Sequence, residues 1–230
     1  NVRRFVNPVT KKFSFANFHN AVSLAYQFLD DLIDANTYPT KKITQTVKRF
    51  RQIGLGLMGL ADVFLALGYR YGGANSCEIT EQIMLAFNSA VKATNKTLAK
   101  SRGAYPAWTP AASTAKLRNF TTSCIAPTGT ISQIAGCSSG IEPIFSFDEM
   151  DRSIAGKRYV VPGPAKSAIA SANVTTEQLS IDEHLNVLKI VQRHVDMSVS
   201  KTINLPNSAT RDEVAEAYLK CAKLGIKGVT

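Results

Sequence analysis

Residues 124–143 read CIAPTGTISQIAGCSSGIEP and carry the groups in this chain best suited to hold an anion. Gly129 leaves room for a ligand to approach, Thr128 and Thr130 offer hydroxyl donors, and a helix beginning near Thr130 would direct free N–H groups at the anion. The pattern predicts a phosphate cradle, although no Gly-Lys-Ser/Thr follows as in a Walker loop. The alternative is a plain strand-to-helix turn, in which proline and glycine only shape the turn and Glu142 is a cap or surface residue. Composition alone favours this alternative.

A second stretch, IGLGLMGLAD at 53–62, places glycines at 54, 56 and 59 in the G-x-G-x-x-G spacing of dinucleotide-binding turns. Such a turn needs a buried strand before it and an acidic residue roughly 20 positions after it. The preceding residues, KKITQTVKRFRQ, are basic and amphipathic, and Glu78 lies at the start of an expected long helix. The motif therefore does not predict NAD or FAD binding. We expect its glycines to let a helix around 54–62 pack closely against neighbouring backbone.

The cysteines and histidines are few and scattered. The four cysteines, Cys77, Cys124, Cys137 and Cys221, show no C-x-x-C spacing, which predicts neither a zinc knuckle nor a disulfide scaffold. Of the three histidines, the two at 184 and 194 are too far apart for an i, i+4 metal pair. No metal site is predicted.

Composition and charge limit the class of protein. The 230 residues suffice for one large or two small domains, and 45% hydrophobic with 19% charged residues is globular. A net charge of +10 favours anionic partners, but the basic residues form no long block, so nucleic-acid binding is not predicted. There is no apolar run of roughly 20 residues and no secretory leader. We expect a soluble, cytoplasmic protein without membrane contact, cut at both ends from a longer polypeptide because it begins at Asn1 and ends in the strand-like GIKGVT.

The expected elements divide the chain into a helical part, about 1–103, and a mixed part, about 118–230. In the first part the 3.6-residue periodicity predicts helices at 15–35 and 77–101, with a charged stretch at 41–51 and a short apolar run at 63–67. In the second part, strands are expected at 121–126, 130–136, 141–147, 158–162, 201–206 and 226–230. Helices are expected at 182–199 and at 210–224, where Thr210 and Glu213 make a T-x-x-E capping box. Strands alternating with helices predict an α/β fold with a parallel sheet or a barrel wall.

Three stretches together resemble one family. They are RQIGLGLMGLAD (51–62), LRNFTTSCIAPTGTISQIAGCSSGIEPIF (117–145) and VDMSVSKTINLP (195–206), and they are similar to the C-terminal half of ribonucleotide reductase catalytic subunits. The form APTGTIS…AGCSSGIEP, followed by SKTINLP and AYLKCAKLGIKG, most resembles the adenosylcobalamin-dependent class II. The iron-dependent class tends to carry different residues in the same loop. The resemblance covers roughly residues 15–230.

The resemblance implies that residues 1–230 are the C-terminal portion of a ten-stranded α/β barrel. It implies radical reduction of ribonucleotides to 2′-deoxyribonucleotides with adenosylcobalamin as cofactor. The implied partners are a ribonucleotide, a thioredoxin-type or dithiol reductant, the rest of the enzyme and a second copy in a homodimer. The family's phosphate-binding loop falls on Pro127, Thr128, Gly129, Thr130 and Ile131, with Ser132 as a further contributor.

The resemblance assigns no catalytic residue to this chain. The radical cysteine of the family lies upstream, and its redox cysteines match none of the four present here. Cys124 and Cys137 are therefore expected to be buried structural thiols, and the chain alone to be inactive. Residues 147–165 are less typical of the family. The iron-dependent class and a non-catalytic nucleotide-binding module remain alternatives, a nicotinamide-dependent oxidoreductase is the weakest interpretation, and the choice between diphosphate and triphosphate substrate stays open.

Overall fold

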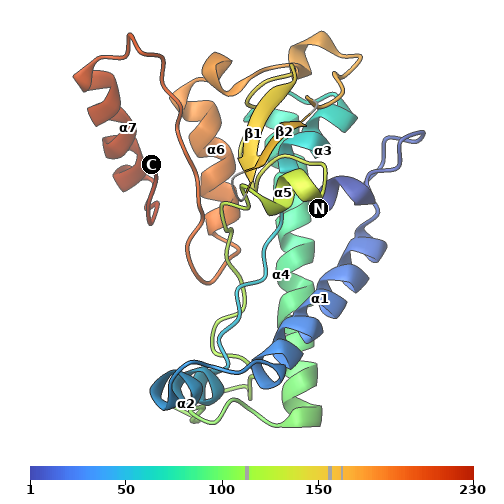
Figure 1. Ribbon diagram of the computed structural model, residues 1–230, viewed down its shortest axis with the longest axis vertical. Coiled ribbons are helices and arrows are strands. Elements are labelled where there is room, and N and C mark those ends of the chain that lie inside the picture. The colour runs from blue at the N-terminus through green and yellow to red at the C-terminus, as the bar shows by residue number, and fades with distance from the viewer. Residues whose placement is uncertain (112–113, 155–156, 162) are drawn as a thin grey trace.

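The computed structural model describes residues 1–111, 114–154, 157–161 and 163–230, and most of its regular elements are helices (Figure 1). The helices are α1 (Phe15–Ala35), α2 (Lys41–Phe50), α3 (Leu60–Leu67), α4 (Ala74–Arg102), α5 (Ile131–Ile134), α6 (Ile181–Gln192) and α7 (Arg211–Lys223). Short 3-10 turns are η1 (Val2–Phe5), η2 (Ala170–Ala172) and η3 (Thr176–Gln178). The strands β1 (Met150–Ile154) and β2 (Lys157–Val161) pair in antiparallel register.

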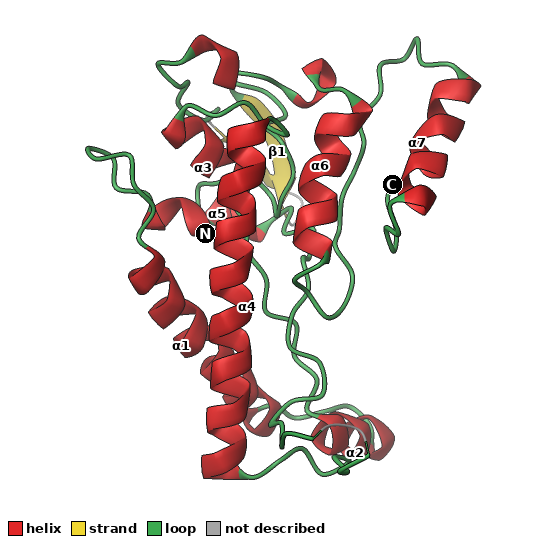
Figure 2. Ribbon diagram, turned by 180° about the vertical axis from the view of Figure 1, so that it is seen from behind, coloured by secondary structure: helices red, strands yellow, loops and turns green. Residues whose placement is uncertain are grey.

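The helices of the first part confirm the periodicity. α1 spans the predicted 15–35, and α4 contains the predicted 77–101 and ends at Gly103, which caps it with a positive φ. The charged stretch at 41–51 forms α2, which begins at a Thr40 cap whose hydroxyl accepts from the N–H of Ile43 at 3.2 Å. α4 packs against α1 on one side and α6 on the other, and so forms the spine of the molecule (Figure 2).

Several expectations for the second part are corrected. α7 begins at the capping box of Thr210 and Glu213 as expected, but α6 ends at Gln192, short of the expected 199, because the chain turns at 193–194. The strand expected at 130–136 is wrong, since α5 occupies its centre, and 141–147 forms no regular strand. Of the strand expected at 158–162, β2 contains 158–161, and Pro162 lies outside the described residues.

Three extended segments lie side by side in parallel, although none forms a regular strand. Leu55 bridges Ser123, and Ile125 bridges Val199, so residues 121–125 lie between 53–57 and 197–200. The backbone N–H groups of Leu55 and Ile125 donate across these bridges at 2.9 and 3.1 Å. Farther along, Thr230 donates to the carbonyl of Lys201 at 3.0 Å. The described residues thus show a parallel arrangement of the expected kind, without a closed barrel.

The glycines at 54 and 56 lie in this parallel set and not in a helix, which corrects the expectation for 54–62. A Cβ on Gly56 would lie 2.2 Å from the backbone oxygen of Cys124, and one on Gly54 would lie 2.8 Å from its Sγ. Glycine is therefore required for the two segments to approach each other. The chain then turns into α3 at Gly59, whose φ of +83° is in the left-handed region. The residues before Gly54 form the helix α2 as far as Phe50, and within the described residues no strand leads into the first glycine, as expected from the sequence.

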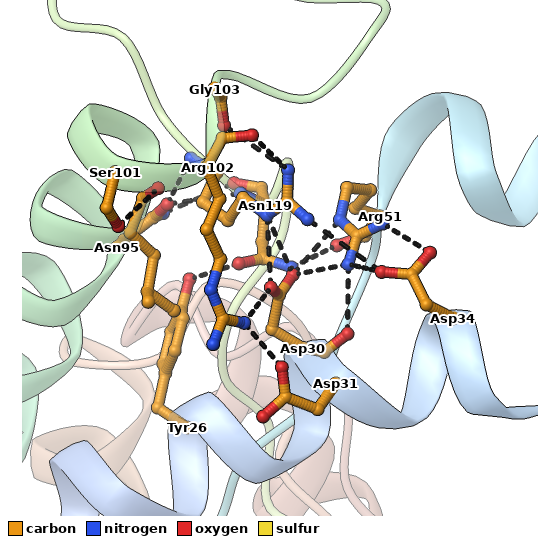
Figure 3. A network of polar contacts seen from close by, with 12 residues as sticks. Tyr26, Asp30, Asp31, Asp34, Arg51, Asn95, Ser101, Arg102, Gly103 and Asn119 are labelled. Atoms are coloured by element: carbon orange, nitrogen blue, oxygen red, sulfur yellow. Dashed lines mark hydrogen bonds and ion pairs between the residues drawn. The ribbon is translucent and has the colours of Figure 1, made fainter.

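A buried carboxylate on α1 joins this helix to the C-terminal ends of α2 and α4 (Figure 3). Asp30 of α1 is fully buried and accepts hydrogen bonds from Arg51 at 2.8 Å, Arg118 at 3.0 Å, Asn119 at 3.0 Å and Arg102 at 3.2 Å. Burial raises the pKa of this carboxyl, but the hydrogen bonds from its partners outweigh burial and leave the pKa below its usual value. Through Asn119, this cluster holds the start of the segment that leads to the loop at 126–131. Among the described residues, no helix is long and apolar enough to cross a membrane.

Candidate functional site

The loop at 126–131 leaves the parallel set at its carboxyl edge. The segments 53–57, 121–125 and 197–200 run in the same direction, so the turn into α3, this loop and the residues after Lys201 all emerge on one side. In parallel α/β arrangements, ligands bind at this edge. The candidate phosphate loop is therefore placed where the fold favours a ligand.

The loop has a tight conformation centred on Thr128. This residue has a φ of +53°, in the left-handed region that a β-branched residue seldom adopts. Its carbonyl accepts from the N–H of Ser132 at 2.9 Å, and its hydroxyl accepts from the N–H of Gly140 at 2.8 Å. α5 starts directly after Thr130, so the condition that the anion site requires, a helix start near this residue, is met.

Three consecutive backbone amides of this loop are available to a ligand. The N–H groups of Gly129, Thr130 and Ile131 donate to no acceptor within the described parts of the chain, and all three residues are exposed. A Cβ on Gly129 would meet no atom within 4 Å, so the fold itself does not require glycine at this position. The arrangement can bind an anion through N–H groups at the start of a helical turn.

Ser132 links the loop to a segment that follows it in the chain. Its side chain is buried, and its hydroxyl bonds that of Ser139 at 2.9 Å, so it joins the loop to residues 138–142. Within that segment, the backbone carbonyl of Ser139 accepts from the N–H of Glu142 at 2.8 Å. The segment forms a second wall behind the loop.

A buried lysine holds this second wall. The ammonium of Lys201 donates to Glu142 Oε2 at 2.7 Å, to His184 Nδ1 at 3.0 Å and to the carbonyl of Thr202 at 2.5 Å. The N–H of Thr202 donates to Glu142 Oε1 at 2.8 Å, so both carboxylate oxygens are bonded. Glu142 is thus an ion-pair partner, which corrects the reading of it as a cap or surface residue.

Burial governs the protonation of this cluster. Burial, and then the neighbouring Lys201 ammonium, lower the pKa of His184 to about 4, so this imidazole is neutral at pH 7. Burial also lowers the pKa of Lys201, and Glu142 offsets part of that shift. Because His184 Nδ1 accepts from Lys201, its proton lies on Nε2, which is buried and has no partner among the described residues.

A cavity of about 1110 Å³ lies beside the loop and the second wall. Gln133 and Ser138 are among its lining residues, and their buried oxygens, Oε1 and Oγ, have no hydrogen-bond partner in the part of the chain described. The side chains of Arg3 and Lys11 also line it and make it suited to an anionic ligand. The cavity is also lined by Ser132, Ser139, Glu142, Thr202 and Asn204.

The cysteines offer no activated thiol. All four are free, and burial raises the pKa of each, so the thiolate forms less readily than in an ordinary cysteine. Cys124 and Cys137 are half-buried and not fully buried as expected, and Cys137 lines the cavity. No group of three or more metal-ligating side chains comes together within the described ranges.

The residues that sequence reasoning missed are Lys201 and His184. Lys201 lies in SKTINLP and Glu142 in SSGIEP, two of the stretches that carry the resemblance, but neither spacing indicates that they form an ion pair. The local signal is that Lys201 is the one charged residue in the strand-like run SKTINLP. His184 sits on the buried face of α6 and gives no such signal.

Known families and proteins match nearly the whole chain. The family model described as "Ribonucleotide reductase, barrel domain" matches residues 1–116, 112–180 and 165–230. A vitamin B12-dependent ribonucleoside-diphosphate reductase of Thermoplasma acidophilum is 34% identical to this chain, over 96% of the chain and 33% of the relative. A protein of the same name from Mycobacterium tuberculosis is 33% identical, over 90% of the chain and 34% of the relative.

A relative with a different name covers less. A ribonucleoside-diphosphate reductase subunit alpha of Chlamydia pneumoniae is 26% identical over 61% of this chain and 17% of its own length. The chain spans about a third of the length of the two B12-dependent relatives.

Proposed function

The chain belongs to the family of ribonucleotide reductase barrel domains, and on this premise we propose that it forms part of the catalytic barrel of an adenosylcobalamin-dependent ribonucleotide reductase. The activity is reduction of ribonucleotides to 2′-deoxyribonucleotides. The names of the relatives that cover most of the chain support the cobalamin-dependent class and a ribonucleoside diphosphate as substrate. The iron-dependent class has less support because the subunit alpha covers less of the chain.

We further propose that the three parallel segments belong to a ten-stranded α/β barrel completed by the rest of the enzyme. Their common direction and their single bridges support this, since each segment is held by neighbours in the manner of a barrel wall. The radical and redox cysteines and the contacts with a thioredoxin-type or dithiol reductant are then assigned to the rest of the enzyme.

The observation that carries the proposal is the set of free amides on the loop at 127–131. We assign the substrate phosphates to the N–H groups of Gly129, Thr130 and Ile131, with Thr128 setting the turn and Pro127 restricting its entry. An anchored phosphate fixes the position of the ribose, which supports hydrogen abstraction at a defined carbon. This chain therefore contributes substrate binding and orientation.

Adenosylcobalamin supplies a cobalt–carbon bond whose homolysis starts the radical chemistry. No contact of the described residues identifies a place for the corrin ring in this part of the enzyme. We therefore assign no residue of this chain to the cofactor.

Replacing Gly129 with valine in the full-length enzyme tests the loop. The new side chain would enter the space over the free amides, and we expect the KM for a ribonucleoside diphosphate to rise at least about tenfold. Adenosylcobalamin affinity should remain nearly unchanged. Since a Cβ at Gly129 meets no atom within 4 Å, the fold should tolerate the substitution.

The matched control is Gly228→Val. Gly228 is also exposed, and a Cβ there also meets no atom within 4 Å, but it is not in the loop. We expect its KM to match the parent enzyme. An unchanged KM for Gly129→Val would contradict the assignment of the phosphates to this loop.

A further inference from the structure

The left-handed conformation of Thr128 requires a restraint. A β-branched residue pays a steric penalty at a φ of +53°, and such a conformation persists only where surrounding contacts enforce it. The Thr128 hydroxyl accepts from the N–H of Gly140, and this contact comes from a segment 12 positions farther along the chain. The shape of the loop therefore depends on where residues 138–142 are held.

Residues 138–142 are held in turn by Glu142. Its two carboxylate oxygens are bonded by the ammonium of Lys201 and by the N–H of Thr202, at 2.7 and 2.8 Å. Both donors lie at the carboxyl end of the third parallel segment. A continuous series of contacts thus joins that segment to the loop through Glu142, Gly140 and Thr128.

The contacts of Lys201 fix its ammonium in one position. Its side chain is fully buried, and its three N–H donors have three acceptors, Glu142, His184 and the carbonyl of Thr202. A lysine in this state has no freedom to release Glu142 and find another partner. Loss of the ammonium would leave the Glu142 carboxylate without its charged partner, although the N–H of Thr202 remains.

We propose that Lys201 is a positioning residue for nucleotide binding, which fixes the left-handed turn of the phosphate loop through Glu142 and Gly140. The inference rests on the proposed function of that loop. Lys201 touches neither the free amides nor the substrate phosphates in this assignment. Its effect on the ligand is transmitted through Thr128.

A double-mutant cycle between Lys201→Met and Thr128→Gly tests the proposal in the full-length enzyme. The readout is the dissociation constant of ADP, measured by titration calorimetry without cofactor, together with KM and kcat. We expect Lys201→Met to weaken ADP binding and raise KM by at least about tenfold, with kcat changed by less than about threefold. In the Thr128→Gly background, the hydroxyl through which Gly140 restrains the loop is already absent, so we expect the same change to weaken ADP binding by less than about threefold.

Lys220→Met is the control, because Lys220 forms ion pairs with Asp182 and Glu216 far from the loop. Its ADP affinity should match the parent enzyme. Equal effects of Lys201→Met in both backgrounds would overturn the proposal, since the lysine would then act independently of Thr128. If Lys201→Met does not fold, Glu142→Gln decides: weakened ADP binding supports the proposal and unchanged binding overturns it.

Gly129→Val separates this inference from the proposed function. Weak ADP binding by Gly129→Val with normal binding by Lys201→Met would refute the positioning role alone. Normal ADP binding by both variants would refute the phosphate loop itself.

Discussion

Two buried ionic clusters lie in the described part of the chain. They differ in the sign of the central charge and in the part of the molecule that they hold in place. Asp30 is a buried carboxylate surrounded by guanidinium and amide donors, and Lys201 is a buried ammonium surrounded by acceptors. Each cluster is linked to a non-glycine residue in the left-handed region, Arg51 with a φ of +48° and Thr128 with a φ of +53°. The segment from Asn119 to the loop connects the two clusters.

The difference lies in where the restraint acts. Arg51 is held by its own side chain, which bonds Asp30 and Asp34 directly, and its cluster joins α1, α2 and α4 into a frame (Figure 3). Thr128 is held by a hydrogen bond from the N–H of Gly140, which belongs to another segment, and it lies beside exposed amides and a cavity. The polar contacts of the Asp30 cluster hold helices of the fold together. The Lys201 cluster lies beside a loop whose backbone amides at 129–131 have no acceptor among the described residues. A fully partnered buried charge alone therefore does not distinguish a frame from a site.

The largest expected effect comes from breaking the frame with Asp30→Asn. A neutral amide in place of the carboxylate leaves the surrounding guanidinium groups without their buried counter-charge. We expect the free energy of unfolding to fall by about 3–5 kcal/mol, measured by urea denaturation. At a temperature where the variant remains folded, ADP affinity should be unchanged, because the loop is restrained by the other cluster.

The matched control for this change is Asp182→Asn. Asp182 also pairs with a lysine, but its side chain is 67% exposed, so the loss should stay below about 1 kcal/mol. If Asp30→Asn were no more destabilising than Asp182→Asn, the frame role of the Asp30 cluster would be wrong.

Acid should weaken the Lys201 cluster before the Asp30 cluster. The pKa of His184 is about 4 in the folded chain and about 6.5 when unfolded, so between these values the unfolded state binds a proton that the folded state does not. The free energy of unfolding should therefore fall as pH falls from about 6.5 to about 4, by up to about 3 kcal/mol, and this contribution should level off below. The stabilisation from Asp30 is lost only at lower pH, because its folded pKa lies below the usual 3.8.

His184→Asn isolates this effect. The asparagine Oδ1 can take the place of Nδ1 as acceptor for Lys201, but the side chain does not titrate. Unfolding free energies measured from pH 4 to pH 7 should show a flatter dependence in this variant. An unchanged slope would mean that other groups cause the acid sensitivity.

The sequence predicts the helices of this chain better than its strands. α1 and α4 follow from apolar periodicity, and α7 from the capping box of Thr210 and Glu213, because these signals are local. The extended segments are bonded only across long sequence separations, for example Leu55 with Ser123, and no local pattern encodes that pairing. The same reason explains the error at Gly54 and Gly56, whose need for glycine arises from Cys124 about 70 positions away.

The same distinction between local signals and long-range contacts applies to the candidate site. Glycine, threonine and proline types at 127–131 predict a turn before a helix, and the structure confirms that turn and the start of α5 after Thr130. The left-handed Thr128 could not be predicted, because its restraint by Gly140 comes from 12 positions along the chain, and the segment of Gly140 is bonded in turn through the ion pair of Glu142 with Lys201. That pair joins residues 59 positions apart.

The smallest expected effect on stability sharpens the comparison most. Thr128→Gly relieves a left-handed strain of about 1–3 kcal/mol, but loses the hydrogen bond from Gly140 and adds backbone entropy, each about 1 kcal/mol. The net change in unfolding free energy should be within about 1 kcal/mol, whereas ADP affinity should fall because the loop is no longer fixed. Arg51→Gly, which removes the same kind of strain but also the ion pairs to Asp30, should destabilise strongly and leave ADP affinity intact in the folded protein. Urea denaturation and ADP titration of both variants would thus separate a left-handed residue that serves binding from one that serves the fold; a strong loss of stability in Thr128→Gly would place both residues in the frame.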